Sequence, residues 1–573
     1  MNGTLRLVGS LLTPRDRRIA AMLCMAMFVS AILECIGLGL VLPVLALLSN
    51  DASVLRHVPD FVARVIDTMP RGWLIVLAMA GLLLIYIAKA AFRWMLVQRL
   101  NRFGFRLQRE LSTRLFQGFI SRPWQFHLGR NSTGLLHGVT HDCDQVALGI
   151  VVPALVAVSE GLVIAAITVF LLVIEPTGGV ICLALLGSTG WWFHHKTEAR
   201  ASALGQRRRE CDRSRFRLIR QALEGVKEIQ ALGREQGFTD LVDAASVRSG
   251  TLGARVQSLK DTPRSWFEVL AILGLAALVS TMALRGRDPA SVIGVAGIFA
   301  IAVLRIVPSG TRLMSSIQSM ILAAPSARAL AEELAQHTAP AEAAPGDHDW
   351  SSIDFQRVSF HYSGDRPEVL ADLDARFMRG ESVGLIGSSG SGKSTVVDLA
   401  LGLLEPSAGR IMIGRSNLAM HTRWWRAQVG YVPQSIYLLD DTIRRNVAFG
   451  LSDRDIDDAA VAEALERAQV SEFVASLPDG VSTMVGERGV RLSGGQRQRL
   501  GVARALYGKP SVLILDEATS ALDSATEAEL VHALHALHGK VTMIVVAHRE
   551  ATVAHCDRVF RLVAGQLVEV NRE

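Results

Sequence analysis

The sequence is poor in charged and aromatic residues. Of its 573 residues only 20% are charged and 6% are aromatic, whereas 50% are hydrophobic. An excess of hydrophobic residues on this scale is typical of chains with membrane-spanning segments. Cysteine is also scarce. The six cysteines are scattered and form no C-x-x-C pair, so we expect neither a disulfide framework nor a metal site.

The N-terminal region lacks the pattern of a cleavable signal peptide. Basic residues precede an apolar run over residues 19–48, which is about twice as long as the apolar core of a signal peptide, and no A-x-A-like site follows it. We therefore expect this run to be the first membrane helix. The formal net charge of +6 does not indicate nucleic-acid binding, because the basic residues lie mainly beside apolar runs, as in cytoplasmic loops of membrane proteins.

Six apolar stretches can cross a bilayer, which takes about 20 helical residues. They lie near residues 19–48, 73–97, 147–175, 178–195, 265–285 and 291–308. Only Pro176 and Thr177 separate the third from the fourth, which predicts a tight helical hairpin. The sixth stretch is short and contains Arg305, so its ends are the hardest to place.

The charge of the connecting segments predicts the orientation. The segments after the second and fourth stretches are rich in arginine, whereas the hairpin between the third and fourth has no Lys or Arg. By the positive-inside rule, both termini and the two arginine-rich segments are cytoplasmic. Both segments keep helical periodicity, so we expect the second helix to continue to about residue 118; disordered basic loops are the alternative. Residues 51–69 fit a short amphipathic helix on the outer surface, or else an ordinary loop.

The composition divides the chain into three parts. Residues 1–335 form the predicted transmembrane domain, and residues 336–352, rich in Ala, Glu and Pro, form a predicted linker. Residues 353–573 have the pattern of a soluble α/β domain, with strand-like runs at 382–386 and 512–515.

A glycine-rich loop in the α/β part fits the P-loop pattern G-x-x-x-x-G-K-[ST]. It lies between the strand-like run 382–386 and a helix predicted for residues 395–401, which is the order that a P-loop requires. In such a loop the backbone N–H groups and the lysine bind phosphates, and the last hydroxyl binds Mg²⁺. The predicted nucleotide-binding residues are Gly387, Ser388, Ser389, Gly390, Ser391, Gly392, Lys393, Ser394 and Thr395.

The second strand-like run ends in two carboxylates, Asp516 and Glu517. A buried parallel strand that ends in such a pair fits a Walker B motif. We expect Asp516 to hold Mg²⁺ through water and Glu517 to polarise the attacking water. A core strand with a polar end is the alternative.

The segment Leu492-Ser-Gly-Gly-Gln496 lies between these two motifs. With this LSGGQ sequence the chain resembles the ATP-binding cassette (ABC) transporters. Its layout resembles the type IV exporter half-transporters, which have an all-α transmembrane domain of six helices and an α/β P-loop nucleotide-binding domain. The segment Thr483–Gly489 is also similar to exporter cassettes rather than importer ones.

The resemblance implies further roles for single residues. Tyr362 would stack on adenine, Gln434 would contact Mg²⁺ and the catalytic centre, and His548 would be the catalytic switch residue. It also implies a homodimer in the bacterial inner membrane, with ATP and Mg²⁺ as cofactors. In that dimer the signature segment of one chain covers the ATP of the other. The residues implied there are Ser493, Gly494, Gly495 and Gln496, together with Asp523 of the D-loop.

The substrate is less strongly indicated. Residues 33–43 resemble the equivalent stretch of bacterial flippases for lipid-linked oligosaccharides, of the protein-glycosylation type, in which arginines hold a pyrophosphate. This resemblance implies substrate contacts by Arg93, Arg264 and Arg305. The alternatives are that Arg93 and Arg264 extend to the cytoplasmic interface, or that an arginine pairs with Glu34 or Glu268.

Three functions follow from these patterns. The first is ATP-driven flipping of a polyprenyl-pyrophosphate-linked oligosaccharide, and the second is export of a lipid, peptide or amphipathic drug. The third is an ATP-regulated channel or regulator that does not pump. The third function is disfavoured, because Glu517, His548 and the LSGGQ sequence are all present.

Overall fold

The computed structural model describes residues 2–40, 70–287, 289–336, 349–362, 368–518, 527, 531–532, 534–547 and 550–570. The chain divides into two compact units. The first comprises Met1–Arg122 and Arg130–Ala339, and the second comprises Pro123–Gly129 and Pro340–Glu573.

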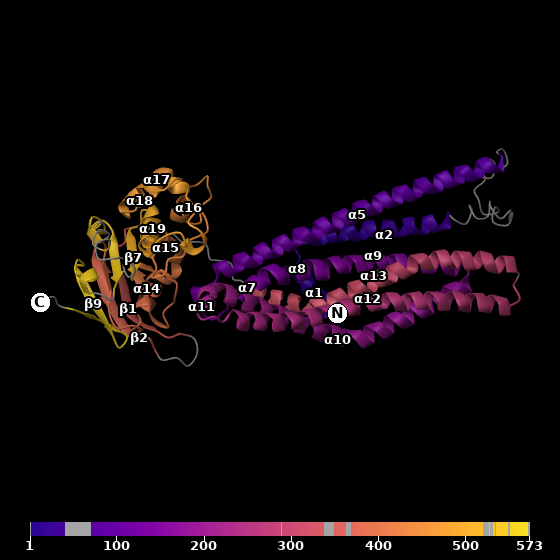
Figure 1. Cartoon of the computed structure of the whole chain (residues 1–573), viewed down its shortest axis with the longest axis horizontal. Helices are drawn as coiled ribbons and strands as arrows, with labels where there is room; N and C mark the ends of the chain where they lie inside the picture. The colour runs from indigo at the N-terminus through magenta and orange to yellow at the C-terminus, as the bar shows by residue number, and fades with distance from the viewer. Residues whose placement is uncertain are drawn as a thin grey trace. The chain divides into compact units, whose positions relative to one another are not determined.

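The first unit is helical. Its elements are α1 (Asn2–Leu11), α2 (Pro14–Gly39), α5 (Arg71–Ser121), α7 (Ser132–His137), α8 (Cys143–Val146), α9 (Val152–Ile174), α10 (Pro176–Glu224), α11 (Val226–Ala231), α12 (Glu235–Leu284) and α13 (Pro289–Ala335). Two π-helical turns, η2 (Gly138–Asp142) and η3 (Ala147–Val151), interrupt the helix that leads into α9. α2 packs along α5 and α9, and α9, α10, α12 and α13 pack against one another. In Figure 1, α2 and α5 run together and diverge from that four-helix group toward one end.

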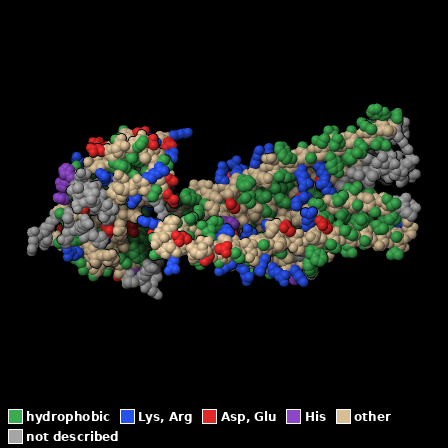
Figure 2. Space-filling model, viewed as in Figure 1, with side chains coloured by type: hydrophobic (Ala, Val, Ile, Leu, Met, Phe, Trp, Pro, Cys, Tyr) green, Lys and Arg blue, Asp and Glu red, His purple; other side chains and the backbone are tan. Residues whose placement is uncertain are grey.

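Within the part of the chain that the structure describes, five helical segments are long and apolar enough to cross a membrane: Pro14–Gly37, Ile75–Ser121, Ser132–Ile174, Glu235–Leu284 and Val292–Ala335. They overlap five of the six predicted stretches. The fourth lies in α10, where glycines, tryptophans and histidines are interleaved with the apolar residues. Hydrophobic side chains cover much of the part of this unit that includes the ends of α5 and α9 to α13 (Figure 2), as expected for a surface in contact with lipid.

The long predicted extension of the second helix is confirmed, because α5 continues to Ser121. Its C-terminal half buries Leu107, Leu111 and Leu115 at four-residue spacing, which puts them on one face of the helix. The predicted hairpin is also confirmed, since α9 ends at Ile174 and α10 begins at Pro176.

The helix that contains the sixth stretch is longer than predicted. Its helix does not stop near residue 308 but continues through Pro308 and Pro325 to Ala335. A proline inside a helix removes one hydrogen bond, which packing against neighbouring helices offsets here. The predicted external segment 51–69 lies outside the described residues.

The second unit contains two sheets. A six-stranded sheet has the order β10-β9-β3-β8-β7-β6, and a four-stranded antiparallel sheet has the order β2-β1-β4-β5. The strands are β1 (Ser352–Phe360), β2 (Leu370–Met378), β3 (Ser382–Ile386), β4 (Ala408–Ile413), β5 (Ser416–Asn417), β6 (Val429–Val432), β7 (Val512–Asp516), β8 (Thr542–Val546), β9 (Arg558–Val563) and β10 (Gln566–Glu569). β3 pairs in parallel with β8 and β9, and β7 in parallel with β6 and β8. The predicted strands at 382–386 and 512–515 are therefore confirmed.

The helices of this unit are α6 (Trp124–Leu128), α14 (Lys393–Ala400), α15 (Thr422–Arg426), α16 (Ile443–Val447), α17 (Asp458–Arg467), α18 (Ser471–Ser476) and α19 (Gly494–Tyr507). Apart from α6, which has no buried residue, they pack in two hydrophobic clusters. α14 packs in the cluster that contains β1 and β3, whereas α16, α17 and α19 pack in a second cluster with Val432 and Leu513. Trp350, which lies within the predicted linker, is buried in the first cluster. Most of the predicted linker, residues 337–348, lies outside the described residues, so its boundaries stay a prediction.

Candidate functional site

The glycine-rich loop connects β3 to α14, as the sequence predicts. Every residue of β3 is buried, so the strand is fixed and the loop emerges at its carboxyl end. Gly392 precedes α14 with φ +105°, and a Cβ there would meet Val369 at 3.0 Å. Glycine is therefore required at this position by both conformation and space.

Lys393 closes the loop on itself. Its ammonium group is largely buried and donates hydrogen bonds to the carbonyl oxygens of Gly387, at 2.8 Å, and Ser388, at 3.0 Å. The loop borders a hollow of about 830 Å³, which is also lined by residues 561–565. Backbone N–H groups, a cation and a helix N-terminus together form a site for phosphate oxygens.

Tyr362 is tied to the first turn of α14. Its hydroxyl lies 3.1 Å from the Thr395 hydroxyl, and its ring packs edge-on against Phe360 at a centroid distance of 5.0 Å. The aromatic residue that the sequence assigns to adenine therefore lies beside the phosphate-binding loop.

The two carboxylates end β7 in different environments. Asp516 is buried at the end of the strand, whereas Glu517 adopts a left-handed backbone conformation with φ +52°. A non-glycine residue with this φ is uncommon and is found mainly at functional sites. The Gln434 side-chain amide donates a hydrogen bond to the Glu517 carboxylate at 2.6 Å. Two predicted catalytic residues that are distant in the sequence are thus in contact.

A further acidic residue, Asp398, lies near Asp516. Burial and the charge of Asp516 raise the pKa of Asp398, on α14, to about 6. Two neighbouring carboxyl groups, the Ser394 hydroxyl and the Gln434 amide supply the oxygen ligands that Mg²⁺ prefers, so the residues present fit this ion. The sequence alone did not single out Asp398, although its position four residues after Ser394 places it on the same side of the helix.

The signature segment forms the start of α19. The Ser493 hydroxyl accepts a hydrogen bond from the Gln496 backbone N–H at 3.2 Å, and the Gln496 side chain accepts one from the Ser493 N–H at 2.8 Å. This capping box fixes the first turn, with Gly494 and Gly495 inside it. The first N–H groups of the helix and the Ser493 O–H group can then donate hydrogen bonds to an anion. His548 and Asp523 lie outside the described residues, so their roles stay predictions.

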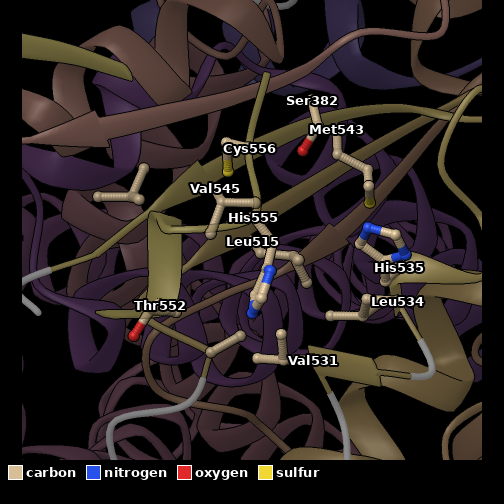
Figure 3. A pocket seen from close by; sticks show the side chains of 12 residues that line it. Ser382, Leu515, Val531, Leu534, His535, Met543, Val545, Thr552, His555 and Cys556 are labelled. Carbon is tan, nitrogen blue, oxygen red and sulfur yellow. The ribbon is translucent and has the colours of Figure 1, made fainter. Parts of the chain in front are cut away.

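A smaller pocket is lined by residues that include Leu515 of β7 and Met543 of β8 (Figure 3). It has a volume of about 50 Å³ and is lined mainly by apolar side chains, including Leu515, Leu534 and Met543. His535 and His555 also line it. The described residues that line it include no Lys or Arg, so it offers no strong phosphate ligand.

The helical unit contains a cluster of six charged side chains, which we call the charged cluster. Its members are Glu34 on α2, Lys89 and Arg93 on α5, Glu160 on α9, and Arg305 and Arg312 on α13. The carboxylates and Lys89 are 6–9% exposed, whereas the three arginines are 35–43% exposed.

Each carboxylate of the cluster bridges two cations. Glu34 lies 2.7 Å from the Lys89 ammonium and 2.7 Å from Nε of Arg305. Glu160 accepts two hydrogen bonds from Arg312, at 2.6 and 3.1 Å, and lies 3.8 Å from Arg93. Four cations therefore face two carboxylates among the described residues.

Two family models match the chain. The model described as "ABC transporter transmembrane region" matches residues 23–283, and the model described as "ABC transporter" matches residues 370–520. An ATP-dependent lipid A-core flippase of Cupriavidus pinatubonensis is 31% identical over 476 residues, which cover 80% of this chain and 78% of the relative. The chain belongs to the ABC transporters.

Other similarities extend over the whole chain. The ATP-dependent lipid A-core flippase of Chromobacterium violaceum is 29% identical over 575 residues, covering 99% of this chain and 94% of the relative. The solved structure of a bacterial Atm1-family ABC exporter with ATP bound superposes with a TM-score of 0.80. It covers 98% of this chain and 95% of the other at 22% identity, so it establishes the fold. This transporter is thus a multi-pass membrane protein with one cassette per chain, and its ATPase is coupled to transport. A half-transporter of this layout works as a dimer.

The three arginines that were predicted to contact substrate do not lie together in the transporter structure. Arg305 and Arg93 belong to the charged cluster, but Arg264 pairs with Glu268 on its own helix at 3.1 Å and its side chain is 78% exposed. The predicted alternative of an Arg305–Glu34 pair is present. Sequence reasoning missed Lys89, Glu160 and Arg312, because single charges within or beside apolar runs give no signal of their partners. The substrate role of Arg93, Arg264 and Arg305 stays a prediction.

Proposed function

We propose that this transporter is an ATP-driven flippase for a lipid that carries a phosphate- or pyrophosphate-linked glycan, a polyprenyl-pyrophosphate-linked oligosaccharide in its most specific form. It would work as a homodimer in the bacterial inner membrane, with both termini in the cytoplasm. The observation that carries this proposal is the charged cluster, in which cations outnumber carboxylates inside the membrane part of the chain.

The depth of the cluster supports a substrate role. At 1.5 Å per residue, Arg305 lies roughly 24 Å along α13 from Pro289, and Lys89 lies roughly 27 Å along α5 from Arg71. The hydrocarbon core is about 30 Å thick, so in the predicted orientation the cluster lies toward the cytoplasmic leaflet. Charged side chains at such depths cost a few kcal/mol and usually serve function.

The chemistry of the cluster favours a phosphorylated ligand. The exposed guanidinium groups of Arg93, Arg305 and Arg312 can each donate two parallel hydrogen bonds, which suit a phosphate or pyrophosphate. A ligand with two negative charges would balance the surplus of cations. A neutral or cationic drug would leave that surplus unbalanced, so this class of substrate is disfavoured.

The cassette supplies the energy. Lys393 and the loop N–H groups would release their internal hydrogen bonds to bind the ATP phosphates, with Tyr362 against the adenine. Glu517, held by Gln434, would orient the attacking water. Mg²⁺, when bound by the oxygen groups near Asp516 and Ser394, would neutralise charge on the phosphates. As the resemblance to ABC transporters implies, Ser493 and the start of α19 would donate hydrogen bonds to the ATP of the partner chain.

A second candidate substrate comes from the relatives, several of which are named as lipid A-core flippases. This candidate and the polyprenyl-linked glycan are both glycolipids, and native mass spectrometry of the purified dimer separates them by the mass of the co-purifying lipid. We expect a phosphorylated glycolipid, which reconstituted proteoliposomes should move across the bilayer only with ATP. Co-purification and ATP-dependent movement of neutral lipids or peptides alone would overturn the proposal.

A further inference from the structure

We propose that Glu34 and Glu160 are internal counter-anions that the anionic group of the substrate displaces, and that they thereby set the affinity and charge specificity of the transport site. This inference rests on the proposed function. It assigns a role to two carboxylates that the substrate itself would not be expected to contact.

The pairing pattern carries the inference. Each carboxylate has one cationic partner on a helix that packs beside its own helix, and a second cationic partner on another helix of the unit. Glu34 on α2 pairs with Lys89 on the adjacent α5 and with Arg305 on α13. Glu160 on α9 pairs with Arg312 on the adjacent α13 and with Arg93 on α5. The contacts of Arg305 and Arg93 therefore link α2 and α5 to α9 and α13.

Burial separates the members that stay from those that can exchange. Glu34, Glu160 and Lys89 are buried, and Lys89 also lies 4.8 Å from the centroid of the Tyr86 ring. The three arginines are more than a third exposed while they contact the carboxylates, so their free N–H groups can already meet an arriving anion. When no substrate is present, the carboxylates balance the charge of the arginines and orient their guanidinium groups.

Displacement follows from competition between anions. A carboxylate carries one charge, whereas a pyrophosphate carries at least two and offers more acceptor oxygens, so it can draw Arg305 and Arg93 away from Glu34 and Glu160. A neutral headgroup cannot. The exchange also breaks the ion pairs of Arg305 and Arg93 that cross between these helices, while the direct packing of α2 on α9 stays in place.

Glu160→Gln is the decisive variant, because it removes a charge while the two arginines that it leaves are well exposed and stay solvated. The full-length dimer in nanodiscs is titrated with farnesyl pyrophosphate, with farnesol as the neutral probe, and ATPase stimulation is measured. We expect the half-stimulating concentration of farnesyl pyrophosphate to fall about tenfold, with no response to farnesol. Glu175→Gln is the matched control, since Glu175 is a buried carboxylate paired with Arg287 at 3.1 Å outside the cluster.

Glu34→Gln alone would leave the buried Lys89 without a counter-charge and is expected to lower stability. The double variant Glu34→Gln/Lys89→Met avoids this loss and should bind the pyrophosphate probe more tightly than wild type. If the wild type responds to farnesyl pyrophosphate but Glu160→Gln and the double variant match it or respond more weakly, the counter-anion role is wrong while the proposed function stands. If the wild type responds equally to farnesol, or to neither probe, the proposed function fails and the inference with it.

Discussion

The cassette site and the charged cluster are built in opposite ways. In the cassette, short contiguous segments carry the chemistry, and backbone geometry positions it: the loop 387–394 between β3 and α14, the end of β7, and the capped start of α19. In the membrane part, six single side chains from α2, α5, α9 and α13 meet only because those helices pack together. A backbone-held site can be recognised from a motif, whereas a site held by opposite charges appears only after folding.

The two regions also differ in what holds each charge. Lys393 donates hydrogen bonds to backbone carbonyls, and Glu517 accepts one from an amide side chain. In the cluster every cation contacts a carboxylate. The ATP site is therefore suited to one fixed ligand. The cluster can redistribute its pairs, which suits a site that must bind and then release a substrate.

Replacing Glu517 by glutamine should produce the largest effect. The variant should lose about two to four orders of magnitude in steady-state ATP hydrolysis, because the carboxylate that polarises water is gone. ATP binding should persist, since Lys393 and the loop N–H groups remain. Hydrolysis by the purified dimer and binding of a fluorescent ATP analogue give the two readouts. Glu569→Gln, an exposed carboxylate on β10 paired with Arg558, serves as control. Turnover near the wild-type value would disprove the role of Glu517.

Arg305→Ala should give the next largest effect and tests the other region. A charge-assisted hydrogen bond contributes about 1.5–3 kcal/mol, so the half-stimulating concentration of an anionic lipid should rise roughly 10- to 100-fold. The variant Arg264→Ala shows whether the sequence or the structure identifies the substrate-binding arginines correctly. The resemblance treats the two arginines alike, whereas the geometry places only Arg305 in the cluster.

Arg287→Ala is the control for general loss of an arginine–glutamate pair, because Arg287 contacts Glu175. Equal losses in the Arg305 and Arg264 variants would favour a site that the cluster does not define. A stable Arg305→Ala protein with undiminished flipping would remove this residue from the site.

The sequence predicted most of the cassette and less of the membrane part. The P-loop and the strands β3 and β7 follow from local spacing, and the roles of Gln434 and LSGGQ were implied by family resemblance alone. The capping box of α19 and the Gln434–Glu517 contact were not predicted. The extent of α13 was not predictable, because Pro308 and Pro325 normally end helices and only packing keeps this one continuous. Arg312 and Glu160 were missed for the same reason, since their pairing depends on how α9 lies along α13.

Ser493→Ala should give the smallest effect and asks whether the backbone-held site has a second role between chains. Its hydroxyl caps α19, so its loss should lower the stability of the cassette by about 1 kcal/mol. Thr442→Ala is the matched control, because the Thr442 hydroxyl caps α16 by accepting a hydrogen bond from the Arg445 N–H and lies outside the predicted ATP site. Thermal unfolding should therefore shift by similar amounts in the two variants. If Ser493 also donates to the ATP of the partner chain, only Ser493→Ala should slow hydrolysis at saturating ATP. Equal hydrolysis rates in the two variants would confine Ser493 to its capping role and leave the shared site to the N–H groups of Gly494 and Gly495.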